Sequence, residues 1–85
     1  MPEAAAEVAS LVKLLGAVAD ALDPGATAAA HPHADPDLLL ALVTERAGAV
    51  AGAIRALLEH PTDLDRRARV LTQLLRDLQQ PSARP

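Results

Sequence analysis

The chain contains no aromatic residue and no cysteine, and these two absences restrict what its 85 residues can build. Without thiols it forms no disulfide, zinc–thiolate site, iron–sulfur cluster or cysteine nucleophile. Without aromatic rings it offers no base-stacking platform and no binding hot spot anchored by tryptophan or tyrosine. A core in this protein must therefore be assembled from aliphatic side chains alone.

The aliphatic residues favour helices over strands. The sequence holds 20 alanines and 15 leucines, which are strong helix formers, but only six valines and one isoleucine. Apolar residues recur at the three- and four-residue spacing of amphipathic helices in three segments, 3–22, 36–60 and 62–80. We predict an all-α antiparallel bundle of these three helices, forming a single domain over residues 1–80 with a flexible tail over residues 81–85.

Turn-forming and capping residues mark the predicted helix ends. Asp35 is placed to cap the second helix, and Thr62 is placed to cap the third, with Asp65 at the acidic position of a capping box. The connection over residues 23–35 is long for a link between two helices, and its alanine-rich stretch 26–30 has the composition for one added helical turn.

Each predicted helix has one row of apolar residues that we expect to face the core. The rows are Ala4, Val8, Leu11, Leu15, Val18 and Leu22; Leu40, Val43, Ala47, Val50, Ile54 and Leu57; and Leu64, Ala68, Leu71, Leu75 and Leu78. The second helix is apolar around most of its circumference, which predicts that it is covered on most sides. Five large aliphatic residues are surplus to the rows: Leu14, Leu38, Leu42, Leu58 and Val70.

A core without aromatic rings is thin for a chain of this size, and small chains often gain burial by associating. The second helix also carries Thr44, Gly48, Gly52 and Ala56 at four-residue intervals, a ridge that lets another helix approach closely. That other helix belongs either to the same chain or to a partner. We predict that a homodimer, or a complex with another helical protein, completes the bundle. The predicted seam consists of Leu39, Leu42, Val43, Thr44, Gly48, Gly52, Ala56 and Leu58.

The charge of the chain and its lack of catalytic motifs also favour protein–protein association. The net charge of −3 disfavours nucleic-acid binding. Residues 1–60 hold eight acidic and three basic side chains, whereas residues 61–85 hold five arginines and three aspartates, so we expect the last helix to pair with acidic neighbours in its own bundle or across a dimer. No serine lies in a nucleophile elbow, and no glycine-rich phosphate loop is present.

The predicted function is therefore protein–protein association, as an adaptor, docking or regulatory subunit, with no enzymatic activity and no cofactor. The N-terminus has no pattern of a secretory signal, which predicts a cytoplasmic location. The apolar segment 38–58 has the length of a membrane span but contains three charged residues, so we expect no membrane partner.

A metal site is one alternative reading. His31 and His33 stand two residues apart beside Asp35 and Asp37, and imidazole and carboxylate are common metal ligands. We favour the other reading of these positions, solvated loop residues, and predict no metal ligand among them. His60, at the end of the second helix, is placed to interact with the negative end of the helix dipole.

An enzyme is the second alternative. The segment DLLLALVTERA, residues 37–47, resembles the first-helix segment of the small all-α chorismate mutases, which form intertwined helical dimers. The resemblance implies that Arg46 binds a substrate carboxylate. Leu57 stands where that family has a basic residue, and no arginine precedes the segment at the family position.

Overall fold

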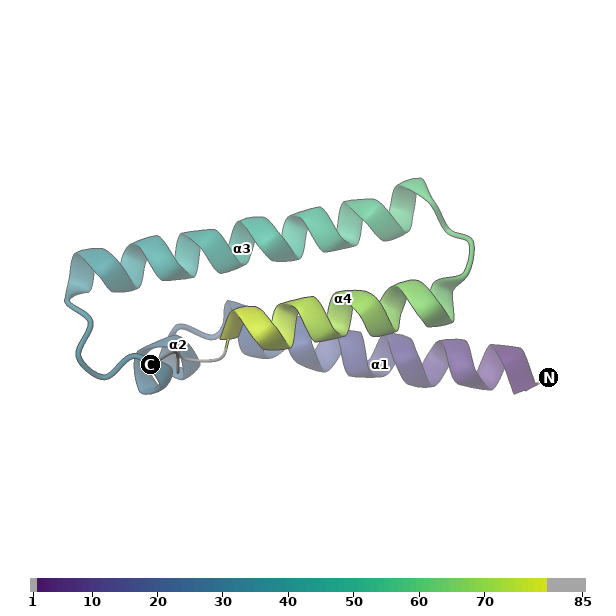
Figure 1. The fold of residues 1–85 in the computed structure, drawn as a ribbon, viewed down its shortest axis with the longest axis horizontal. Coiled ribbons are helices and arrows are strands. Elements are labelled where there is room, and N and C mark those ends of the chain that lie inside the picture. Colours follow the sequence, from purple (N-terminus) through teal and green to yellow (C-terminus); the bar gives the residue numbers. More distant parts are fainter. Residues whose placement is uncertain (1, 80–85) are drawn as a thin grey trace.

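The computed structural model describes residues 2–79, and the fold over that range is all-helical, as predicted. The helices are α1 (Pro2–Leu22), α2 (Pro24–Ala30), α3 (Pro36–Glu59) and α4 (Leu64–Gln79). The three long helices form an elongated bundle in which α3 runs antiparallel to α1 and α4 (Figure 1). The short α2 lies at the end of the bundle where α1 finishes and α3 begins.

The described residues 2–79 form four helices rather than the three predicted, because a capping aspartate starts α2. The Asp23 carboxylate accepts a hydrogen bond from the Gly25 N–H at 2.9 Å, and Pro24 occupies the first turn. Asp35 caps α3 in the same way, accepting from the Leu38 N–H at 2.8 Å, which confirms the predicted cap. His60 is the C-terminal cap residue of α3.

The predicted capping box of α4 was wrong. The helix begins at Leu64, and the residue before it, Asp63, has a φ of 53°, in the left-handed region that aspartate tolerates better than most residues. The Asp63 carbonyl accepts the first helical bond, from the Arg67 N–H at 2.9 Å. The Asp65 carboxylate instead accepts from the Ser10 hydroxyl and pairs with Arg69. The predicted helix end at residue 80 and the tail over residues 81–85 lie outside the described residues.

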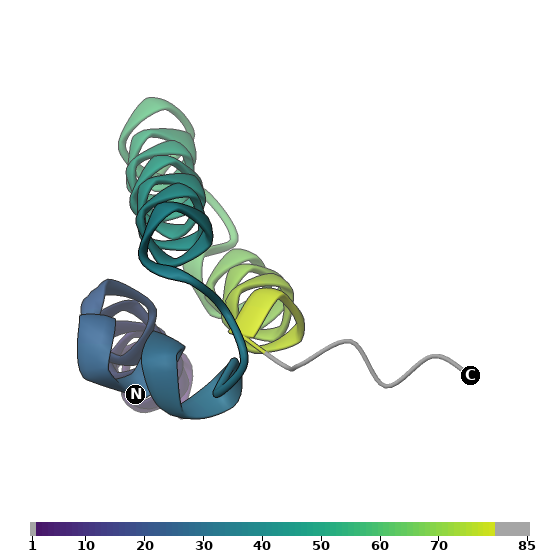
Figure 2. The same cartoon turned by 90° about the vertical axis from the view of Figure 1, so that its left-hand side faces the viewer.

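The core is narrow and built largely from small side chains. Helices α1 and α4 lie side by side along the bundle, while α3 contacts each of them less extensively (Figures 1 and 2). Ala17 and Ala68 are fully buried, and Leu14, Val50 and Leu75 supply the larger core side chains. The Cα radius of gyration is 14.3 Å. A compact chain of this length has about 12 Å, so the fold is a rod with much surface for its core.

The buried face of α1 is rotated from the predicted one. Its buried residues are Ser10, Leu14, Ala17 and Ala21. They precede the predicted residues Leu11, Leu15, Val18 and Leu22 by one position, which is about 100° around a helix. Alanine permits a closer approach to α4 than leucine does, and Leu15 and Leu22 consequently turn outwards. The row predicted for α4 is confirmed, with Ala68 and Leu75 buried and its other three members partly buried.

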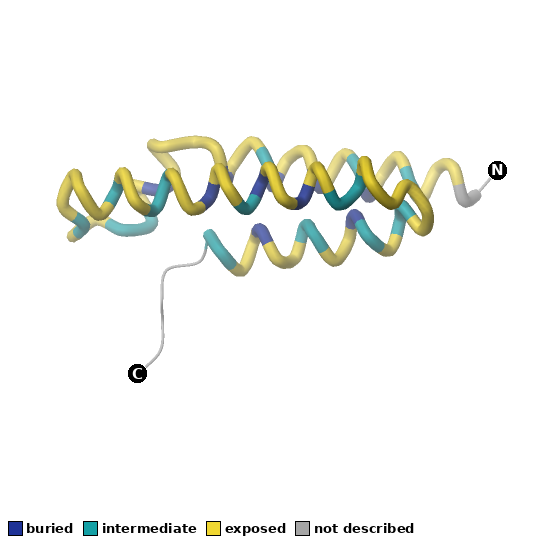
Figure 3. The backbone as a smooth tube through the Cα atoms, turned by 90° about the horizontal axis from the view of Figure 1, so that it is seen from above, coloured by how far each residue is buried: buried dark blue, intermediate teal, exposed yellow. Residues whose placement is uncertain are grey.

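Helix α3 follows its predicted row only in part. Val50 is buried, and Val43 and Leu57 are half-buried, but Leu40 and Ile54 are exposed, as is Ala47. Two residues that we did not place in the core, Arg46 and Ala53, are buried instead. Buried positions face the interior of the bundle, and most other positions are exposed (Figure 3). Among the residues predicted as surplus, Leu38, Leu58 and Val70 are exposed, Leu42 is half-buried and Leu14 belongs to the core.

Candidate functional site

Arg46 is a buried cation that joins three helices. Its side chain is 2% exposed. The guanidinium donates to the Thr27 hydroxyl of α2 and to the carbonyl oxygens of Leu78 and Gln79, at 3.4 and 3.3 Å, at the end of α4. Carbonyls at a helix C-terminus lack intrahelical partners and carry the negative end of the dipole, so a cation suits them. Within residues 2–79, no carboxylate forms an ion pair with Arg46.

We did not predict that Arg46 is buried, because a charged residue on an apolar helix is normally expected at the surface. The spacing of Arg46 from the apolar residues of α3 is the sequence pattern that indicates its burial. Arg46 falls in the three- and four-residue series Val43, Arg46, Val50, Ala53, which the structure turns inwards. The series only becomes visible once the buried face of α3 is known.

The residues proposed as metal ligands do not gather into a site. His31 Nε2 lies 3.4 Å from Nη2 of the cationic Arg46 side chain, while His33 is exposed. In the part of the chain that the structure describes, no three histidine, aspartate or glutamate side chains converge on one point.

The arginines of α4 divide into two groups. Arg69 pairs with Asp65 at 3.2 Å within α4, and Arg76 pairs with Asp20 of α1 at 2.7 Å. The second of these is the pairing with an acidic neighbour that the charge distribution predicted. Arg66 and Arg67 form no ion pair within residues 2–79.

An exposed aliphatic surface lies across α1 and α3. We call it the α1/α3 face and define it by seven exposed residues: Val8, Val12, Leu15 and Leu22 of α1 and Leu40, Ile54 and Leu58 of α3. Leu15 is 65% exposed and Leu58 is 74% exposed. At about 100° per residue, the four positions of α1 fall in one stripe, and so do the three of α3. No charged residue falls within either stripe.

A groove between α1 and α3 joins the two stripes. It has a volume of about 350 Å³ and is lined only by aliphatic side chains, which are Leu11, Leu14, Leu15, Val18, Ile54, Leu57 and Leu58. Leu14 is buried at 3% exposure, whereas Leu15 and Leu58 are open to solvent. The groove therefore links Leu15 of α1 to Ile54 and Leu58 of α3 in one apolar depression within the α1/α3 face.

The structure distributes the predicted seam around α3 instead of gathering it on one face. Leu39, Leu42 and Val43 are half-buried, and Thr44, Gly48 and Gly52 are exposed. A Cβ atom added at Gly48 or Gly52 meets nothing within 4 Å, so within residues 2–79 no helix packs tightly against either glycine. Ala56 lines a depression between α3 and α4, and Leu58 belongs to the α1/α3 face.

Replacing both open glycines by alanine tests what the ridge does. If it faces solvent, Gly48→Ala with Gly52→Ala raises the free energy of unfolding by about 1–2 kcal/mol in total, because alanine restricts the unfolded chain and favours the helix. Chemical denaturation measures this, and sedimentation at the same concentration measures association. If the double substitution leaves the association constant unchanged, the partner binds outside the ridge of Gly48 and Gly52. If it weakens the dimer, the ridge is part of the dimer interface.

The residue that the resemblance to chorismate mutases implicates is already engaged within the fold. The Arg46 guanidinium is occupied by Thr27 and two backbone carbonyls, and Arg55, nine residues further along α3, lies about half a turn away and is exposed. Among the described residues, no helix is both long enough and apolar enough to cross a bilayer. Comparison of the chain with protein-family models, with curated proteins and with solved structures finds no match.

Proposed function

We propose that this protein acts by helix–helix association, and that it forms a homodimer across the α1/α3 face. The observation that carries the proposal is the groove between α1 and α3, which is aliphatic throughout and continues into exposed residues on both helices. Contiguous apolar surface of this kind is uncommon on a monomeric soluble protein and marks interaction sites. The role follows from the surface: the chain serves as an association or docking module.

The weakness of the chain's own core supports a second copy as the partner. The most deeply buried residues of α1 and α4 are Ala17, Ala21 and Ala68, and alanine removes little apolar area from water. The larger side chains Val8, Val12, Leu15 and Ile54 stay on the surface. A second chain that covers them supplies the burial that the single bundle lacks.

The chemistry of the face also suits self-association. A two-fold dimer buries the same surface on both copies, so that surface must be self-complementary. Each copy offers a protruding side chain, Leu58, beside an apolar groove, and neither stripe carries a charge that would face its own copy. Depletion of charge at the centre is typical of stable interfaces.

Sedimentation equilibrium on the full chain and on Leu58→Asp tests the proposal. We expect a dimer at tens of micromolar for the natural sequence. The substitution appears twice in a two-fold interface and removes a buried leucine from each copy, so we expect the dissociation constant to rise by at least about 100-fold.

Leu38→Asp is the matched control. It places the same charge on the same helix, at an exposed leucine that lies about 160° around α3 from Leu58. We expect it to leave the dissociation constant within about threefold of the natural value, as is usual for a change outside the interface. A natural chain that sediments as a monomer at these concentrations contradicts the homodimer. Equal weakening by both substitutions contradicts the assignment of the face.

A further inference from the structure

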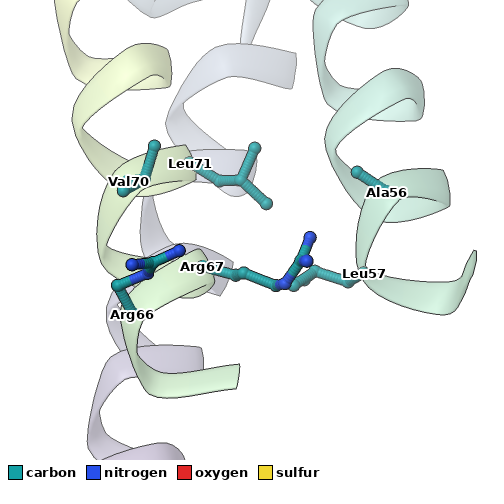
Figure 4. A pocket seen from close by; sticks show the side chains of 6 residues that line it. All are labelled: Ala56, Leu57, Arg66, Arg67, Val70 and Leu71. Atoms are coloured by element: carbon teal, nitrogen blue, oxygen red, sulfur yellow. The ribbon is translucent and has the colours of Figure 1, made fainter. Parts of the chain in front are cut away.

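A second hollow lies on the other side of α3, where α3 meets the start of α4. It has a volume of about 400 Å³, and Ala56, Leu57, Arg66, Arg67, Val70 and Leu71 line it (Figure 4). Four of these residues are aliphatic and two are arginines. Small-molecule sites have this composition, an apolar lining with a few polar groups that orient the ligand.

The charge of the two arginines is not compensated by the chain around them. Arg69 and Arg76 on the same helix each pair with an aspartate, but Arg66 and Arg67 pair with none within residues 2–79. The Arg67 Nε is buried, and no group among the described residues accepts a hydrogen bond from it. The end of the Arg67 side chain reaches from α4 towards Leu57 and points into the space between Leu71 and Ala56 (Figure 4). A buried donor without a partner in a folded protein calls for an explanation, and a bound anion is one.

An apolar track leads away from the arginines between α3 and α4. A neighbouring depression of about 290 Å³ shares Leu71 with the hollow that Arg66 and Arg67 line. Its lining has no polar side chain and consists of Ala49, Gly52, Ala53, Leu71, Leu74, Leu75 and Leu78. Gly52 leaves room there, because a Cβ atom at this position meets nothing within 4 Å. From Arg67 to Leu78 the track is about 16 Å long at the rise of an α-helix.

We infer that the hollow and the apolar track between α3 and α4 together bind a single-chain aliphatic carboxylate, of the kind represented by a medium-chain fatty acid. The carboxylate lies against the guanidinium group of Arg67, whose fork of donors matches two carboxylate oxygens, and Arg66 lines the same hollow as a second positive charge. The alkyl chain lies along Leu71 and Leu74 over Gly52. The site uses neither the exposed residues of the α1/α3 face nor the dimer, so it stands independently of the proposed association.

NMR titration of the isotope-labelled full chain with dodecanoate, kept below its micelle concentration, tests the inference. We expect saturable shifts of the methyl signals of Val70, Leu71 and Leu74. Dodecyltrimethylammonium has the same chain with a cationic head, and we expect it to bind at least tenfold more weakly. Acetate, which has the head without the chain, is expected to cause no saturable shift.

Three variants assign the binding to the arginines and the track. We expect Arg67→Gln to weaken dodecanoate binding at least tenfold, while Arg69→Gln, the matched control on the same helix, changes it less than twofold. Gly52→Leu fills the track at a position with open space and is expected to weaken binding at least tenfold, even if Arg67→Gln does not fold. Equal binding of the anionic and cationic amphiphiles, unchanged binding by Gly52→Leu, or the absence of saturable shifts overturns the inference.

Discussion

Arg46→Ala is expected to lower the free energy of unfolding by about 3 kcal/mol, because it removes several charge-assisted hydrogen bonds at once from a buried position. The Arg46 guanidinium donates to Thr27 in α2 and to the carbonyls of Leu78 and Gln79 at the end of α4. The substitution leaves Thr27, which is fully buried, without this donor. Each kcal/mol corresponds to about 4–8 °C in the melting temperature of a domain this size, so thermal denaturation reads the effect directly.

Two further substitutions separate the charge of Arg46 from its bulk. Arg46→Met keeps most of the apolar volume, and we expect it to cost less than half as much, because a buried charge replaced by an apolar side chain of similar size is often tolerated. Arg55→Ala, at an exposed position of the same helix, is expected to change stability by no more than about 0.5 kcal/mol. Equal stability of Arg46→Ala and the natural chain would contradict a role for this side chain in holding α2 and α4 to α3.

These measurements belong at one fixed protein concentration. Association adds to apparent stability by mass action, so a dimer melts at a higher temperature when it is more concentrated. Repeating the Arg46 series in the Leu58→Asp background removes the proposed dimer contact. We expect the loss caused by Arg46→Ala to be the same in both backgrounds, because Arg46 is buried within one chain.

Ala17→Leu is expected to destabilise the fold by about 2–3 kcal/mol, the upper part of the range for overpacking a core. Ala17 is fully buried where α1 lies along α4, and no leucine fits there without a backbone shift. Chemical denaturation with urea measures the loss. We expect the midpoint to fall with little change in the dependence on urea, since the surface exposed on unfolding stays similar.

Ala9→Leu provides the comparison for Ala17→Leu. Ala9 is exposed on the same helix, so the added leucine meets solvent, and we expect stability to change by no more than about 0.5 kcal/mol. If Ala17→Leu is as stable as Ala9→Leu, then α1 and α4 do not pack as closely as the buried alanines indicate.

Helix α4 shows where sequence reasoning succeeds. It has one apolar row in an otherwise polar helix, so only one face can be buried, and Leu64, Ala68, Leu71, Leu75 and Leu78 were predicted correctly. The cap at Asp35 succeeded for a similar reason, because a cap depends on a few residues adjacent in the chain. The cap predicted at Thr62 was wrong, since α4 begins at Leu64 and the Asp65 carboxylate accepts a hydrogen bond from Ser10, which is 55 positions away in sequence.

Helices α1 and α3 show why the rest required tertiary structure. Both are apolar around much of their circumference, so periodicity allows several buried faces of nearly equal hydrophobicity. The choice among them depends on which residues let two helices approach. Ala17, Ala21 and Ala68 permit a close contact. Four larger residues of α1 are turned outwards as a result, namely Val8, Val12, Leu15 and Leu22, whereas Leu14 stays in the core.

Helical character, the alanine- and leucine-based core and the cap of α3 follow from the sequence alone, because they rest on the backbone preferences of single residues and their near neighbours. The tertiary structure decided which helix faces are buried. It also decided that Arg46 donates hydrogen bonds to the last carbonyls of α4, and that Arg66 and Arg67 lie at one end of an apolar track. These features join residues far apart in the chain. Their energies depend on packing and on the placement of charges in space, which local sequence does not encode.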